Sequence, residues 1–176
     1  MPPPLPSAQK LREAANRALL LVPGLYAKFT DATQEMFNLL KEDEAEEEDY
    51  KFWRGALSEC YAALREKQEC VRRYLEADLR ESGGGGRHNS ASLSDIELNR
   101  DMGATLNKVK ERLRQLPLEL PPASKEKRKP CIDSNYAMYK LVEELARRTH
   151  AWEPEVCAHY SLVAFESARQ ASTKKQ

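Results

Sequence analysis

Residues 50–79 read YKFWRGALSECYAALREKQECVRRYLEADL, and this stretch decides the fold. Its apolar residues recur at steps of three and four, which places them along one side of an α-helix. This apolar stripe lapses only around Lys67 and Gln68, and about thirty residues give roughly 45 Å of helix. Such a length is typical of a long hairpin arm or of coiled-coil-like packing. The stripe consists of Tyr50, Trp53, Leu57, Cys60, Tyr61, Leu64, Val71, Leu75 and Leu79.

The residues before this helix predict a second arm of the same kind. MPPPLP at residues 1–6 is extended because each proline restricts the backbone, and Ser7 is placed to cap a helix that follows. Helical spacing runs from Leu11 to Val22 and, after Pro23 and Gly24, from residue 25 to residue 40. We expect Pro23 to bend one long helix. The acidic run at residues 41–49, KEDEAEEED, predicts a solvated turn and the first turn of the next helix.

The residues after the long helix repeat the pattern. Ser94 and Glu97 fit a capping box, which predicts a helix that continues to residue 116 and contains Gly103. Residues 117–130 hold four prolines and are predicted to form a proline-rich basic loop. Helical spacing resumes from residue 132 to residue 152, and Pro154 predicts a kink before a last stripe at residues 156–167.

The prediction is therefore an all-α fold, a bundle of two helical hairpins with about four to six helical segments. No alternation of useful length indicates a β-strand. The expected parts are a proline-rich leader at residues 1–6, an N-terminal helical hairpin at 7–81, a glycine- and serine-rich linker at 82–92, a C-terminal helical hairpin at 93–170 and a frayed tail at 171–176.

The linker begins with SGGGGRHN at residues 82–89 and separates two halves of opposite charge. Residues 1–82 hold 12 lysines and arginines against 16 acids, a net charge of −4, whereas residues 87–176 hold 16 against 12, a net charge of +4. Opposite charges favour packing of one half on the other. A natural loop and an engineered join both fit these glycines. We favour a join, which would either replace an excised loop or tether two chains as a linker-fused helical heterodimer.

Composition narrows the class of protein further. The longest apolar run, at residues 18–22, is far shorter than the ~20 residues of a transmembrane helix, so no membrane insertion is expected. The N-terminus does not have the pattern of a signal peptide. Cysteines at positions 60, 70, 131 and 157 follow no disulfide framework. We therefore expect reduced thiols in a nuclear or cytoplasmic protein.

The sequence contains no motif that predicts an enzyme, a cofactor site or a metal site. None of the three histidines lies in a nucleophile motif. His150, Cys157 and His159 are chemically suited to zinc, but their spacing is not a ligand pattern, and a buried cysteine with surface histidines explains them better. The glycine run follows a helix rather than a strand, so it is not expected to bind phosphate.

Aromatic residues give the most specific indication of function. Phe52 and Trp53 are adjacent on the long helix, where neighbours diverge by ~100°, so both cannot face one core seam. Leu162 and Phe165 likewise lie beside the last apolar stripe. Exposed aromatic anchors are typical of binding hot spots. We therefore expect a non-enzymatic module, a subunit or adaptor of a multiprotein complex, that binds partner helices or peptides through an apolar groove.

The alternative is a helical subunit that contacts nucleic acid or chromatin with the basic loop. The residues that would make this contact are Lys125, Lys127, Arg128 and Lys129. Because pI is near neutral at about 6.8, the chain lacks the strong basic balance of most nucleic-acid-binding domains. Ser94 precedes two acids and could accept a phosphate, but the capping box explains the same residues.

Overall fold

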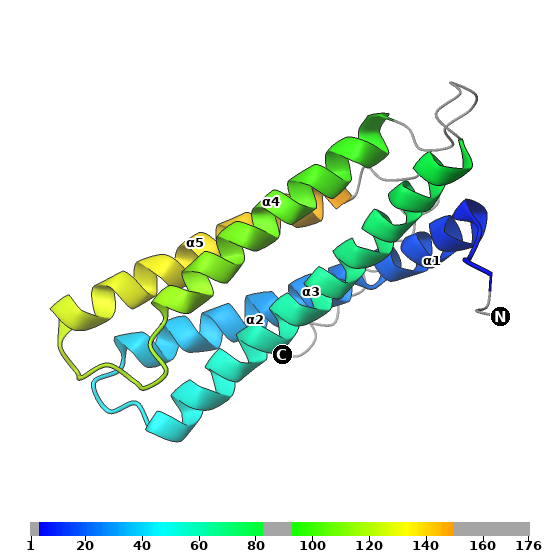
Figure 1. The fold of residues 1–176 in the computed structure, drawn as a ribbon. Coiled ribbons are helices and arrows are strands. Elements are labelled where there is room, and N and C mark those ends of the chain that lie inside the picture. Colours follow the sequence, from blue (N-terminus) through cyan, green and yellow to red (C-terminus); the bar gives the residue numbers. More distant parts are fainter. Residues whose placement is uncertain (1–3, 83–92, 150–176) are drawn as a thin grey trace, which may run out of the picture.

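The computed structural model describes residues 4–82 and 93–149, and within them the fold is all-α (Figure 1). Neither range contains a β-strand. The long helix that the apolar spacing predicts is present and is 35 residues long. The helices are α1 at Ala8–Leu20, α2 at Val22–Lys41, α3 at Glu47–Glu81, α4 at Leu93–Gln115 and α5 at Lys125–Thr149.

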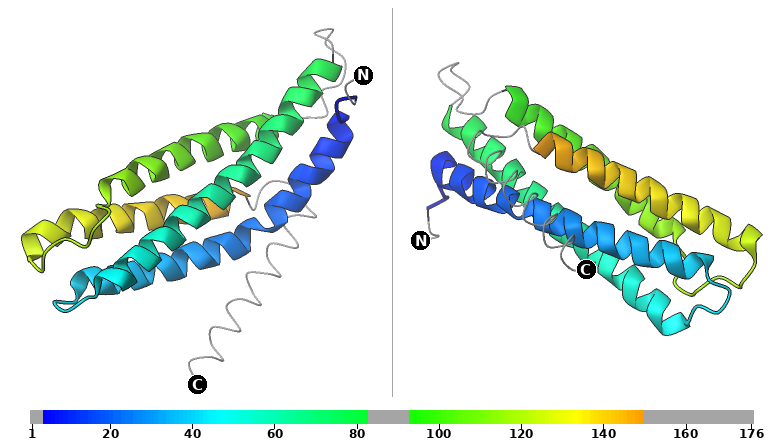
Figure 2. Two further views of the ribbon diagram at one scale, coloured as in Figure 1. Left: turned by 60° about the horizontal axis from the view of Figure 1, so that its bottom comes forward. Right: turned by 180° about the vertical axis from the view of Figure 1, so that it is seen from behind.

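The helices form an elongated bundle with four arms. α1 and α2 follow each other as one bent arm, and α3, α4 and α5 make the others (Figures 1 and 2). Each arm packs against the next in the chain, and α5 closes the bundle by packing against α2. α1 packs chiefly against α3, so that the bent arm follows α3 along its length.

The bend lies at Leu21, one residue before α2 starts. Leu21 keeps a right-handed helical backbone and donates its N–H to the carbonyl of Ala18 at 3.1 Å. Pro23 is the second residue of α2, where its missing N–H would have no partner within the helix. The proline therefore starts α2, and the arm bends there as the sequence predicts.

Local caps explain where the helices begin. Ser7 accepts a hydrogen bond from the N–H of Lys10, which confirms it as the N-cap of α1. The carboxylate of Glu81, at the end of α3, accepts a bond from the N–H of Ala8 at 2.8 Å. Glu47, Glu48 and Asp49 form the first turn of α3, as the acidic run predicts. α4 begins at Leu93, one residue before the predicted cap position, Ser94.

One continuous hydrophobic core runs through the bundle and draws on both halves of the chain. Its largest fully buried side chains come from all five helices and from Leu116, the residue that follows α4. They are Leu19, Phe29, Met36, Leu40, Tyr50, Leu57, Leu64, Tyr74, Met102, Leu106, Leu116 and Met138. The two halves therefore pack on each other, through α2 with α5 and through α3 with α4.

The predicted loop at residues 117–130 is shorter than expected because α5 starts at Lys125. The carbonyl of Ser124 accepts bonds from the N–H groups of Lys127 and Arg128 and so opens the helix. Pro130 is the sixth residue of α5 and removes a single backbone donor there. Residues 116–120 instead pack along the first turns of α3, where Tyr50 donates its hydroxyl to the carbonyl of Pro117.

Candidate functional site

The α2–α5 groove runs along the outer seam between these two helices, which lie side by side in the rear view of Figure 2. Its aromatic section is a recess of about 280 Å³. Side chains spaced by three and four residues on each helix line it, as antiparallel packing of two helices requires. They are Thr30, Thr33, Gln34 and Phe37 of α2 and Asn135, Tyr136 and Tyr139 of α5.

Asn135 is the polar centre of the aromatic section. Its side chain is 2% exposed, and its Nδ2 donates to the carbonyl of Thr33 at 2.8 Å. Among the described residues, no donor reaches its Oδ1. The hydroxyls of Thr30 and Thr33 cannot supply one, because each donates to a carbonyl of α2. A buried acceptor without a donor costs about 1–3 kcal/mol, so a donor that reached this oxygen would stabilise the protein.

Aromatic rings and lysine ammonium groups meet along the same section. The Nζ of Lys41 lies 4.2 Å from the ring centroid of Phe37, and the Nζ of Lys140 lies 5.6 Å from that of Tyr136. Burial, together with a hydrogen bond with Tyr139, raises the pKa of Tyr26 to about 12. Tyr26 is therefore neutral at physiological pH, and the section offers π-faces and phenolic hydroxyls.

The cationic section continues the seam at the end of α2 and the start of α5. It has a volume of about 320 Å³. Four of the residues that line it are cations and only Asp43 is an acid. The lining residues are Leu40, Lys41, Asp43, Ala123, Ser124, Lys125, Arg128, Lys129 and Ile132.

Arg128 belongs to the fold rather than to the exposed basic loop in which the sequence places it. Its side chain is 5% exposed. Its guanidinium donates to the carbonyls of Leu40, at 3.5 Å, and of Glu42, both at the C-terminal end of α2. A third bond, at 3.2 Å, goes to the carbonyl of Pro121. Lys125, Lys127 and Lys129 are exposed, as a basic surface requires.

The predicted aromatic site on α3 is divided between core and surface. Phe52 is 65% exposed, whereas Trp53 packs against the core. Their rings meet edge to face with centroids 4.9 Å apart. This agrees with the expectation that the two cannot share one seam. Leu162 and Phe165 lie outside the described residues, as do His150, Cys157, His159 and Pro154.

The remaining chemistry of the described residues is limited. Burial raises the pKa of the Cys60 and Cys131 thiols, which keeps them protonated and weakly nucleophilic. Within residues 4–82 and 93–149, no three histidine, cysteine, aspartate or glutamate side chains gather as a metal site would need. No helix in that part of the chain has the length and apolar character to cross a membrane.

Sequence reasoning missed this groove because it assigned Phe37, Tyr136 and Tyr139 to core stripes. Tyr136 is 55% exposed, and the other two are partly buried. The available signal was the pair Asn135–Tyr136: neighbours on a helix diverge by ~100°, so an amide and a ring at these positions cannot both face one core seam.

Comparisons with known proteins place this fold and groove in no class. No family model, no curated protein and no solved structure matches the chain.

Proposed function

We propose that this chain is a non-enzymatic helical interaction module, a subunit or adaptor of a larger assembly. It binds a helix or peptide of another protein in the α2–α5 groove. One observation carries the proposal: the aromatic section gathers Phe37, Tyr136 and Tyr139 at one surface recess, with Tyr136 55% exposed.

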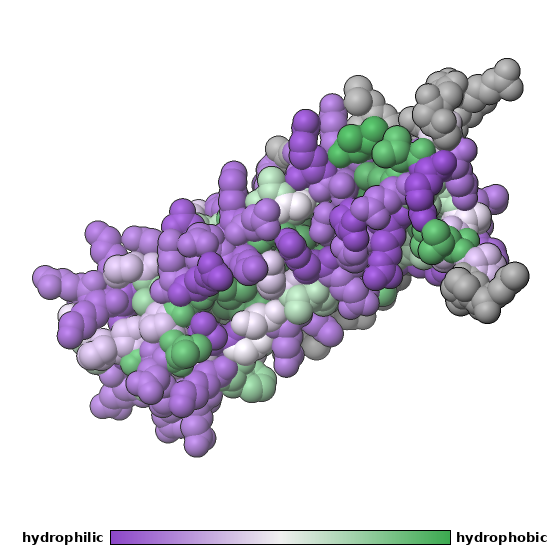
Figure 3. Space-filling view, in the orientation of Figure 1, coloured by the Kyte–Doolittle hydropathy of each residue, from purple (hydrophilic) through white to green (hydrophobic). Residues whose placement is uncertain are grey.

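The physical argument is that a bound helix would cover the aromatic side chains that the groove leaves partly exposed. Helices commonly bind in apolar grooves between two other helices through anchors spaced by three and four residues. Aromatic residues dominate such contacts because each buries a large area with little loss of conformational freedom. Polar side chains cover most of the face shown in Figure 3, whereas the groove lies on the α2–α5 face behind it.

The test compares two exposed aromatic residues that lie on different faces. Tyr136→Ala removes a groove residue, and Phe52→Ala removes a similarly exposed ring on α3, 55% and 65% exposed respectively. The full-length chain and both variants are used for quantitative affinity purification from cells. Circular dichroism shows that both variants remain folded. We expect a partner that is recovered with the wild type and with Phe52→Ala to be lost with Tyr136→Ala.

Equal recovery with Tyr136→Ala would refute the groove as the binding site. Loss of the partner with Phe52→Ala alone would place the site at Phe52 and Trp53 instead. Either result is clear because both substitutions remove exposed side chains that contribute little to stability.

A further inference from the structure

The aromatic and cationic sections form one continuous groove. Lys41 lines the cationic section, and its ammonium stacks over Phe37 of the aromatic section at 4.2 Å. On α5, Ile132 of the cationic section lies one turn before Tyr136 of the aromatic section. An occupant of the aromatic section therefore reaches the cationic section within about one helical turn, ~5.4 Å.

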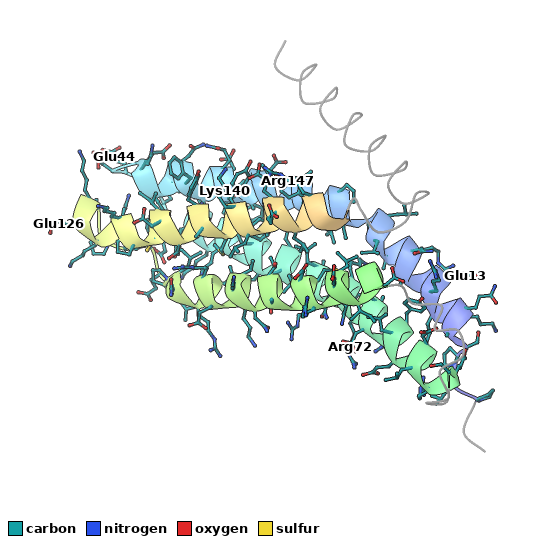
Figure 4. All side chains as sticks on the ribbon, turned by 90° about the horizontal axis from the view of Figure 1, so that it is seen from above. Glu13, Glu44, Arg72, Glu126, Lys140 and Arg147 are labelled. Atoms are coloured by element: carbon teal, nitrogen blue, oxygen red, sulfur yellow. The ribbon has the colours of Figure 1, made fainter. Side chains whose placement is uncertain are left out.

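Charge is distributed unevenly along this groove. At the cationic section, no carboxylate of the described residues forms an ion pair with Lys41 or with the guanidinium of Arg128. At the opposite end, Glu143 is bound by Lys140 at 3.4 Å and by Arg147 at 3.2 Å. Figure 4 shows these two cations on the side of α5 that borders α2. Lysines without an ion pair among the described residues thus line the groove where α2 ends and α5 begins.

We infer that the occupant is an amphipathic helix or peptide that carries aspartate or glutamate next to its apolar anchors. This inference rests on the proposed function and names the chemistry of the partner. The apolar anchors fill the aromatic section, and the acids lie over Lys41, Lys125 and Lys129. Complementary charge of this kind fixes the direction of the bound peptide and speeds its association.

A peptide fits this surface better than a nucleic acid does. Arg128 already donates to three backbone carbonyls, which leaves it little capacity to bind phosphate. The acidic run at residues 42–49 lies at the same end of the bundle, where Figure 4 labels Glu44 and Glu126. A phosphate backbone extends past the three lysines with one charge at every nucleotide, so it would meet these acids. A short peptide with a few acidic side chains could bind the three lysines without reaching the acidic run at residues 42–49.

The experiment selects peptides from a displayed random library against the full-length chain. The selected peptides are labelled with a fluorophore, and their affinity is measured at low and high salt. A groove variant replaces Lys41, Lys125 and Lys129 by glutamine. A matched control replaces Lys108, Lys110 and Arg112, three exposed cations of α4, by glutamine. Tyr136→Ala is measured in parallel.

We expect the selected peptides to be rich in acids beside apolar residues. Removal of three partly screened ion pairs should weaken them by about tenfold, and the α4 control should leave affinity within about twofold. If binding needs Tyr136 but ignores the three lysines, the inference fails and the proposed function stands. If no peptide is selected, or binding ignores Tyr136, both fail. If an oligonucleotide binds the wild type more tightly than the peptides do, and the groove variant no longer binds it, the inference of an acidic peptide is overturned in favour of a nucleic acid.

Discussion

Arg128→Met should lower the free energy of unfolding by about 3 kcal/mol, although the residue lies among lysines that tolerate substitution. The guanidinium is almost completely buried and donates to carbonyls at two separate places. One is the C-terminal end of α2, at Leu40 and Glu42, and the other is the connection between α4 and α5, at Pro121. Methionine has a similar length but no donor, so all three carbonyls lose a partner.

The magnitude follows from these bonds. A hydrogen bond to a charged group contributes about 1.5–3 kcal/mol, and a cation at a helix C-terminus adds about 0.3–1 kcal/mol. The contributions do not add fully, because the carbonyls lie near the end of the bundle and can regain water. A loss of about 2–4 kcal/mol is therefore expected.

Urea denaturation followed by far-ultraviolet circular dichroism measures this loss. Lys129→Met is the matched control, since Lys129 is the exposed neighbour, and it should change stability by less than about 0.5 kcal/mol. Arg128→Lys should fall between the two, because an ammonium keeps the charge but lacks the planar arrangement of donors. If the free energy of unfolding of Arg128→Met lies within about 1 kcal/mol of that of the wild type, the guanidinium does not hold the end of α2 to the connection between α4 and α5.

Three further predictions concern the core, the tyrosines and the groove. Gly103→Ala should raise the free energy of unfolding by about 0.5–1 kcal/mol, because an added Cβ would lie 3.7 Å from Gln68 Nε2, an ordinary contact. Gly55→Ala is the control, because an added Cβ there meets nothing within 4 Å, and it should raise the free energy of unfolding by a similar amount. If the free energy of unfolding falls for Gly103→Ala alone, α3 and α4 are packed too closely for a methyl group. Burial raises the pKa values of Tyr26 and Tyr50 from an ordinary 10.0 to about 12. The folded state therefore favours the neutral phenol, so stability should be complete below pH 10 and should fall as the pH rises towards 12. Urea midpoints across this range measure the fall, and flat midpoints would contradict it. Asn135→Leu removes one hydrogen bond but also the acceptor that no described residue satisfies. The free energy of unfolding should therefore stay within about 1 kcal/mol of the wild type. A loss above about 3 kcal/mol in urea denaturation would show that Oδ1 does have a donor.

The helices were predictable because their signals are local. Spacing by threes and fours is enough to place α3, and Ser7 identifies the start of α1 from its own side chain. Prediction failed where a distant contact outweighs a local preference. Pro130 argues against helix, yet α5 passes through it because Ser124 opens the helix and Arg128 attaches it to the end of α2. Residues 40 and 128 are far apart in the chain, so no local rule reveals this bond.

The groove was harder to predict for a related reason. Helical spacing shows which residues share one side of a helix, but it does not show which two sides meet or where they fail to fill the space between them. Tyr136 and Tyr139 fit a core stripe as well as a groove. Only the pairing of α5 with α2 decides between these, and that pairing is set by contacts such as Asn135 with Thr33.

The contacts between the two halves determine how the chain would behave if it were cut between α3 and α4. Glu47 accepts from the N–H of Leu120 at 2.9 Å, Arg54 donates to the carbonyl of Leu116 at 3.2 Å, and Arg128 caps α2 from the other half. Neither fragment alone would keep these bonds or cover its share of the core. We expect the two pieces to associate one to one, in a complex whose stability depends on concentration as that of the single chain does not. In that setting, each half would act as a folding partner for the other.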